Sequence, residues 1–355
     1  MKRILLIFLL LAALTGSARA WEAPRELEKA LPEDARELLG GGTVPDAGTL
    51  SSLLDKVGEQ VGKVLRQRVR GAASISLAAL LCGTVESLRP SGDGGKTALF
   101  LPMAGALSVT LLTAGSLNSL IGLGTKTIGE LNTFSKALLP TLAAAVAASG
   151  RVGAAAFRQV TTVFFIDLLI GLIDRVLLPL TYLYIGVLTA SACLPGGRLA
   201  ALAEGLKKAV TWLLTTALLA FTLYLSIGGV IAGSADGMAV KVAKATVSGA
   251  VPVVGGILAE ISETVLAGAG VLRNTVGIFG MLAVLAACAY PFLQLGIQYL
   301  IYKLTAFLAG AVGAPGLNRL IDGLGGAFGL VLGMTGSCAA LLLVSILASV
   351  AAVVP

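Results

Sequence analysis

Glu260 and Glu263 are two carboxylates three residues apart in an otherwise apolar stretch. Such a pair could bind a cation or share the acid and base steps of a hydrolysis. The chain has no histidine, and no third ligand or acid–base partner accompanies the two glutamates. The pattern therefore favours a packing or pore-lining helix, and we expect neither catalytic residues nor enzyme activity.

The backbone is interrupted just before these glutamates. Pro252 and Gly255-Gly256 break the chain, and a helix can restart near Ile257. One narrow face of that helix is polar or small, and it carries Glu260, Glu263, Ala267, Gly270 and Asn274. We predict a broken amphipathic helix over 247–277 that lies at an interface, lines a cavity or re-enters the membrane.

Asp167 and Asp174 are seven residues apart and therefore share one helix face. Ionisable side chains inside membrane spans are costly and suggest a function, such as lining a water-filled path or forming an interhelical ion pair. A simpler explanation is that Asp174-Arg175 lies at a junction between two spans, where water solvates both groups. Both interpretations remain open.

A ridge of small residues repeats near the C-terminus at Gly325, Gly329 and Gly333. Glycine at every fourth position lets another helix approach closely. The ridge predicts close helix packing, either within one subunit or between subunits of a homo-oligomer.

Two other patterns do not support a site. The stretch 92–97 ends in Gly-Gly-Lys-Thr but has Pro90 where a phosphate-binding loop needs glycine, so a turn explains it better. The four cysteines lie in separate apolar runs without the spacing of a zinc site or a disulfide framework. We expect no metal and no cofactor.

The elements that carry these residues are predicted to be membrane helices. Residues 71–355 hold only 25 charged side chains, and the mean hydropathy of the chain is +0.93. About 20 apolar residues cross a bilayer as a helix. The fold class is therefore all-α, a polytopic membrane protein with about seven to eight membrane-embedded helices. The predicted spans are 71–88, 98–123, 137–149, 159–173, 176–193, 209–233, 276–300 and 327–354.

The N-terminus has a different character. Residues 1–20 have a basic start, a short apolar centre and Ala18-Arg19-Ala20, which is typical of a cleavable signal peptide. Residues 21–70 hold 17 charged positions and form a predicted extracytoplasmic segment, with an amphipathic helix over 50–65. That helix could lie on lipid, dock on a partner or cover its own membrane domain.

We interpret the basic residues of this chain as determinants of its orientation in the membrane. The formal charge of +7 falls to +4 when Lys2, Arg3 and Arg19 are removed with the signal peptide, so we expect no nucleic-acid partner. If the mature N-terminus is exported, the loops 89–97, 150–158, 194–208 and 301–326 are cytoplasmic. They hold nine basic residues against six in the external loops, a modest bias in the direction of the positive-inside rule that the basic cluster at 63–70 opposes.

The block Val247–Gly277, its continuation Ile278-Phe279-Gly280 and the later pair Tyr290-Pro291 resemble the stage III sporulation protein AE family of endospore-forming bacteria. The resemblance covers nearly the whole chain. It implies a multi-pass component of the mother-cell membrane around the forespore. The implied partners are the sibling membrane proteins of the same operon and a forespore-membrane protein, which together form a channel-like or secretion-like complex.

The expected function is thus a non-enzymatic subunit of that sporulation complex, needed for forespore development after engulfment. The alternative is a stand-alone secondary transporter, a class in which helices with glycine and proline breaks are common. No clear inverted repeat relates the two halves of the chain. Ion-coupled transport also usually needs more carboxylates near the membrane midplane than Asp167 alone.

Overall fold

Long α-helices make up nearly all of the part of the chain that the structure describes. The structure is a computed structural model, and the residues it describes are 25–32, 35–36, 47–87, 97–148, 152–194, 198–250, 255–311 and 315–351. The helices in these ranges are α2 (Arg25–Lys29), α4 (Ala47–Ser87), α5 (Thr97–Ala148), α6 (Val152–Leu172), the π-helical turn η1 (Ile173–Leu177), α7 (Leu178–Cys193), α8 (Arg198–Ala250), α9 (Gly255–Ala311) and α10 (Pro315–Ala351).

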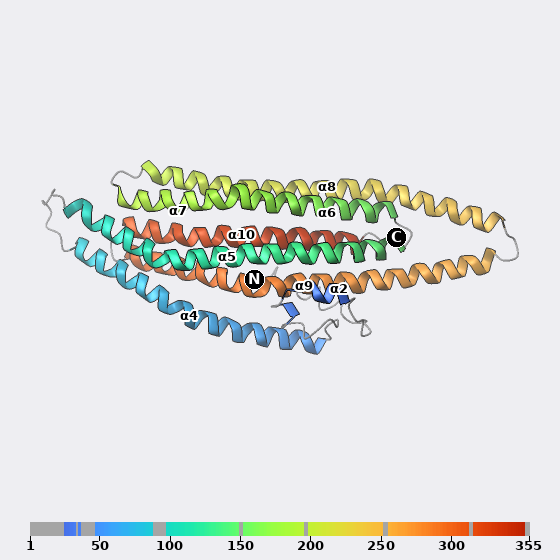
Figure 1. Cartoon of the computed structure of the whole chain (residues 1–355), viewed down its shortest axis with the longest axis horizontal. Helices are drawn as coiled ribbons and strands as arrows, with labels where there is room; N and C mark the ends of the chain where they lie inside the picture. The colour runs from blue at the N-terminus through green and yellow to red at the C-terminus, as the bar shows by residue number, and fades with distance from the viewer. Residues whose placement is uncertain are drawn as a thin grey trace.

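The helices lie side by side as one elongated bundle in which successive rods run in opposite directions (Figure 1). The α7–α8 end of the bundle is where α4, α7 and α9 finish and where α5, α8 and α10 begin. The opposite end is called the α8–α9 end. On that side α5 and α10 finish and α6 begins, and α8 finishes and α9 begins farther out.

The core lies where α5, α9 and α10 meet. Helices α9 and α10 pack along most of their length, and α5 lies against both. Tyr302 of α9 is 1% exposed, its ring lies 5.1 Å from that of Phe328 in α10, and its hydroxyl donates a hydrogen bond of 3.0 Å to Thr113 in α5. A second buried hydroxyl pair, Thr162 and Ser345, joins α6 to α10.

Four of these helices contain segments that are long and apolar enough to cross a membrane. They are Met103–Ala148, Leu199–Gly228, Asn274–Ala311 and Gly316–Val350. Large apolar side chains on their outer faces, such as Leu111, Leu223 and Phe307, are exposed, as expected for surfaces in contact with lipid. The protein is therefore an all-helical, multi-pass membrane protein, with fewer such segments among the described residues than the seven to eight predicted.

The predicted division of 98–149 into two spans is wrong, because α5 is one helix of 52 residues. The residues between the two predicted spans have no helix breaker strong enough to form a loop. Their charged side chains lie on the outside of the helix: Lys126 is 3.5 Å from Glu130, and Lys136 is 3.7 Å from Asp167 of α6. Charges that suggested a loop are instead accommodated on one helical face.

The predicted boundary between spans at 173–176 is a helix irregularity, since α6 continues through η1 into α7. The N–H of Leu178 donates to the carbonyl of Ile173, five residues earlier. Pro179 follows directly and has no N–H to donate, and its ring disfavours a regular α-helical turn before it. The wider π turn adjusts the helix at this point without ending it.

These two corrections also change the predicted orientation. Because α5 is one helix that starts at the α7–α8 end, its C-terminal end lies on the opposite side of the bundle, toward the α8–α9 end. If α5 crosses the membrane once in this direction, the segments before and after it lie on opposite sides, whereas the sequence analysis placed 89–97 and 150–158 on the same side. Arg158, assigned to a cytoplasmic loop, is instead a residue of α6 that is only 9% exposed.

The described part of the N-terminal segment packs on the bundle. Leu27, Leu31 and Ala35 are buried in the main apolar cluster, and α2 contacts α5. The amphipathic helix expected over 50–65 is the first part of α4 and continues into the following apolar stretch. On it, a hydrogen bond from Lys63 and its charge lower the pKa of the fully exposed Glu59 carboxyl. The predicted signal peptide over 1–20 lies outside the described residues.

Candidate functional site

The predicted polar or small helix face that carries Glu260 and Glu263, called the glutamate stripe, lies in the N-terminal part of α9. This helix begins at Gly255, two residues before the expected restart. Gly256, Glu260 and Glu263 belong to its first turns, while Pro252 and the side chains of the two glutamates lie outside the described residues. Asn274, the last member of the stripe, is exposed.

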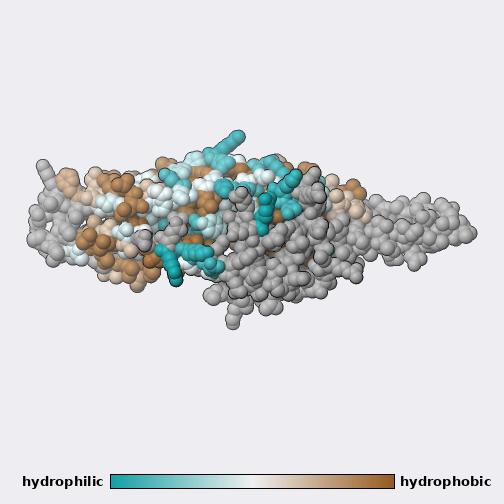
Figure 2. Space-filling model, turned by 60° about the horizontal axis from the view of Figure 1, so that its bottom comes forward, coloured by the Kyte–Doolittle hydropathy of each residue, from teal (hydrophilic) through white to brown (hydrophobic). Residues whose placement is uncertain are grey.

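The two aspartates expected to line a path lie on the outside of the bundle. Asp167 is 55% exposed and lies 3.7 Å from Lys136, and Asp174 is exposed in η1. Figure 2 shows hydrophilic side chains around the middle of the bundle and a more apolar surface toward the α7–α8 end. Asp167 therefore takes part in an ion pair between α5 and α6, and a role in lining a path stays a prediction.

The glycine ridge lies along α10. A Cβ at Gly325 would lie 2.9 Å from the Cβ of Tyr302, and one at Gly329 would lie 3.3 Å from the Tyr299 ring, both on α9. Gly333 has more room, with Leu214 of α8 at 3.8 Å. The first two glycines thus allow α9 and α10 to approach closely within one subunit.

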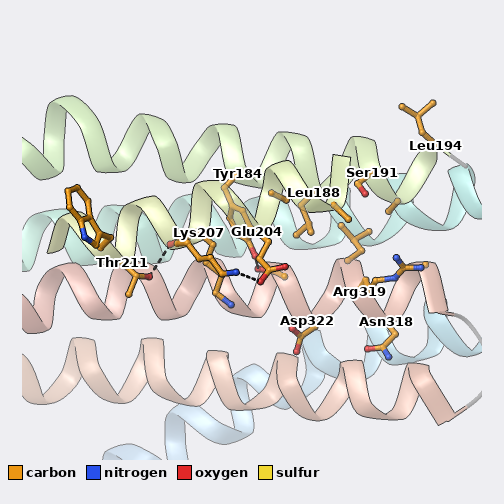
Figure 3. A pocket seen from close by; sticks show the side chains of 18 residues that line it. Tyr184, Leu188, Ser191, Leu194, Glu204, Lys207, Thr211, Asn318, Arg319 and Asp322 are labelled. Carbon is orange, nitrogen blue, oxygen red and sulfur yellow. Dashed lines mark hydrogen bonds and ion pairs between the residues drawn. The ribbon is translucent and has the colours of Figure 1, made fainter. Parts of the chain in front are cut away.

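The structure brings together a different set of residues at the α7–α8 end. A cavity of about 900 Å³ opens between α7, α8 and α10 (Figure 3). Its charged lining residues are Glu204, Lys207 and Lys208 on α8 and Arg319 and Asp322 on α10. Tyr184 on α7 and the apolar Leu188, Leu194, Trp212 and Leu320 complete much of the wall.

The two carboxylates of this cavity have cationic partners. Glu204 Oε1 lies 2.8 Å from Lys208 Nζ on the same helix. Asp322 Oδ1 lies 2.5 Å from the Nζ atom of Lys303, a residue of α9. Tyr184 donates a hydrogen bond of 2.8 Å to the carbonyl of Gly323 and so fixes α7 against α10. Neither acid is isolated, and the surplus charge in the cavity is positive.

Sequence reasoning did not identify this cavity. Lys207, Lys208 and Arg319 were interpreted as basic loop residues, and Tyr184, Glu204 and Asp322 were not singled out. The one signal in the sequence is that these charges occur inside otherwise apolar helices, near their ends. The approach of α10 to the consecutive helices α7 and α8 is visible only in the structure.

The described residues contain no cluster of metal-ligating side chains. No group of three or more aspartate, glutamate or cysteine side chains in these ranges is placed to hold a metal ion. Cys288 and Cys338 are buried, Cys82 and Cys193 are half-buried, and none of the four forms a disulfide.

Comparison with known proteins gives the family. The family model described as Stage III sporulation protein AE matches residues 46–353, which include every helix of the bundle from α4 to α10. The chain belongs to this family. It is 27% identical to the Stage III sporulation protein AE of Bacillus subtilis (strain 168) over 212 residues.

That alignment covers 60% of this chain and 53% of the relative, so it spans about half the length of the curated protein. No solved structure matches the chain. Family membership and the apolar helices together establish a sporulation-family membrane protein, which agrees with the resemblance stated above.

Proposed function

We propose that this chain is an integral, non-enzymatic subunit of a channel or secretion-like complex that joins the mother cell to the forespore. The observation that carries the proposal is the family match over residues 46–353. That match coincides with a multi-pass bundle of long apolar helices. A structural or pore-forming role accounts for such a bundle.

The proposed location is the mother-cell membrane around the forespore, with residues 21–70 on the exported side after removal of the signal peptide. The proposed partners are the sibling stage III membrane proteins of the same operon and a protein of the forespore membrane. The exposed charges on the outside of α5 and α6, such as Lys126, Lys136 and Asp167, support a partnered surface, because lipid solvates charged groups poorly.

Deletion of the gene in its own spore-forming host tests the proposal. We expect normal vegetative growth and normal engulfment, followed by loss of late forespore-specific transcription measured with a fluorescent reporter. Complementation by the intact gene should restore spores. Normal spores together with a growth defect on one nutrient would contradict the proposal and favour a secondary transporter.

The broken helix can be tested in the same assay. Replacing both Glu260 and Glu263 with leucine should reduce spore yield, because it impairs assembly of the complex or passage through it. Replacing both with glutamine keeps the stripe polar and should give a higher spore yield than the leucine variant. Membrane levels of each variant, measured by immunoblot, separate this effect from loss of the protein. Spore counts equal to wild type in the leucine double variant would remove the stripe from the mechanism.

A further inference from the structure

We propose that the cavity between α7, α8 and α10 binds a phosphate-bearing anion, with Lys207 and Arg319 as its main cationic contacts. The proposal is independent of the sporulation role, because it concerns a ligand of the purified protein. It rests on the charge of the cavity, the placement of Lys207, the helix ends around it and the apolar part of its wall.

The charge balance favours an anion. The five charged lining residues comprise three cations and two anions, which leaves one net positive charge. Lys303 pairs with Asp322 from the neighbouring helix and raises the surplus to two. Lys208 and Lys303 each engage a carboxylate, whereas no ion pair among the described residues involves Lys207.

Lys207 reaches across the cavity to α10. A Cβ built at Gly326 would lie 3.2 Å from Lys207 Nζ and 3.1 Å from the Tyr184 hydroxyl. The ammonium and the phenol hydroxyl therefore both approach Gly326, where an added Cβ would make them shift by a few tenths of an ångström. Figure 3 shows Tyr184, Glu204 and Lys207 gathered between the α7–α8 pair and α10. The Tyr184 hydroxyl donates its proton to the Gly323 carbonyl, so the donor available to a phosphate oxygen at this point is the Lys207 ammonium, which can form charge-assisted hydrogen bonds.

Two helix N-termini add to the positive potential. Ala200 in the first turn of α8 and Gly316 in the first turn of α10 both line the cavity. The first N–H groups of a helix have no partner within it, and the helix dipole makes this end favourable for anions. Both helices are long, with 53 and 37 residues. The cations and the helix ends thus act on the same space.

The size and wall of the cavity indicate more than a bare phosphate. A volume of about 900 Å³ lies near the top of the range of small-molecule sites. Leu188, Leu194 and Leu320 supply apolar surface, and Trp212 at the edge is 66% exposed. Tryptophan is enriched where membrane proteins meet lipid headgroups. The ligand chemistry is a phosphate attached to a glycerol or apolar group, as in an anionic phospholipid or a small soluble phosphate ester.

Native mass spectrometry of the full chain in detergent tests the lipid source. The probes are phosphatidylglycerol and, as a zwitterionic comparison, phosphatidylcholine. We expect retention of phosphatidylglycerol by the intact protein. Affinity should fall about tenfold in Lys207→Gln and in Arg319→Gln, since loss of one charge-assisted contact is worth roughly that factor. Lys207→Arg keeps the charge and should keep most of the binding.

The matched control is Lys126→Gln, which removes an exposed lysine from the outer face of α5, away from the cavity. Thermal unfolding in detergent shows whether each variant is folded. Equal retention of phosphatidylglycerol by Lys207→Gln, Arg319→Gln and Lys126→Gln would overturn the proposal. Equal affinity for phosphatidylglycerol and phosphatidylcholine, together with no binding of soluble phosphates, would also overturn it.

Calorimetric titration of the delipidated protein with glycerol 3-phosphate and inorganic pyrophosphate tests the soluble source. Binding that is lost in Lys207→Gln and kept in Lys126→Gln, without a preference between the two lipids, would support the same site with a free phosphate ester as its ligand. Gly326→Ala offers a further variant of unchanged charge. Its added Cβ should shift Lys207 Nζ and weaken the binding of either ligand.

Discussion

Gly122 and Gly124 lie two positions apart in α5 but have different surroundings. Nothing lies within 4 Å of a Cβ placed at the exposed Gly122. A Cβ at Gly124 would lie 2.5 Å from Cγ1 of Val331 and 3.3 Å from the Thr335 hydroxyl, both on α10. Val331 is β-branched and buried, so it cannot easily turn away. One glycine is needed for packing and the other is not.

We therefore predict that Gly124→Ala destabilises the protein and that Gly122→Ala does not. The first change overpacks the α5–α10 contact, at a cost of about 1–3 kcal/mol. The second should be neutral or stabilising by about 0.5–1 kcal/mol, because alanine loses less backbone entropy in a helix. Thermal unfolding of both variants in the same detergent measures the difference. Equal melting temperatures would show that α5 and α10 do not approach this closely.

At the scale of elements, Tyr302 joins three helices. Its ring packs on Phe328 of α10, its Cβ lies beneath Gly325, and its hydroxyl donates to Thr113 of α5. Thr113 in turn donates to the Val109 carbonyl. The contact combines apolar packing with the hydrogen bond to Thr113, and substitutions can separate these two contributions.

Replacement of Tyr302 with phenylalanine should cost about 1 kcal/mol, the net value of a typical hydrogen bond. Replacement with alanine should cost about 3–5 kcal/mol, because it also leaves a cavity between α9 and α10. Chemical denaturation followed by helix content measures both. A phenylalanine variant as unstable as the alanine variant would mean that the hydrogen bond, and not the packing, holds these helices together.

The sequence indicated the type of each element better than its extent. The all-helical class and the start of α9 near residue 257 follow from apolar runs and from Gly255-Gly256. The continuity of α5 could not be predicted, because Lys126, Glu130 and Lys136 reduce local hydropathy whether they lie in a loop or on an exposed helix face. The cavity was also hidden, since Tyr184 meets Gly323 only through tertiary packing across 139 residues.

At the scale of the whole molecule, the helix directions determine the topology. The ends of α4 and α7 lie together at one end of the bundle, and the ends of α5 and α8 lie at the other. The three junctions at the α7–α8 end adjoin seven of the nine basic residues that were assigned to the cytoplasm, all except Arg151 and Arg158. The positive-inside rule thus favours this end as the cytoplasmic one.

Alkaline phosphatase fusions test this arrangement, because the enzyme is active only outside the cytoplasm. Fusions placed between α5 and α6 and between α8 and α9 should be active. Those between α4 and α5, α7 and α8, and α9 and α10 should be inactive, with immunoblots confirming equal amounts. If the α5–α6 fusion behaved like the α7–α8 fusion, α5 would not cross the membrane as one helix.

Helices α8 and α9 continue beyond the end of α10 as a two-helix arm (Figure 1). All three share the α7–α8 end, and their lengths are 53, 57 and 37 residues, so the arm projects about 24–30 Å past α10 at 1.5 Å per residue. An arm of this length would amplify any rotation at its base. A rotation of about 10° at its base would displace its tip by about 5 Å, close to one helical pitch. Small rearrangements inside the bilayer would therefore be magnified at a point well away from it.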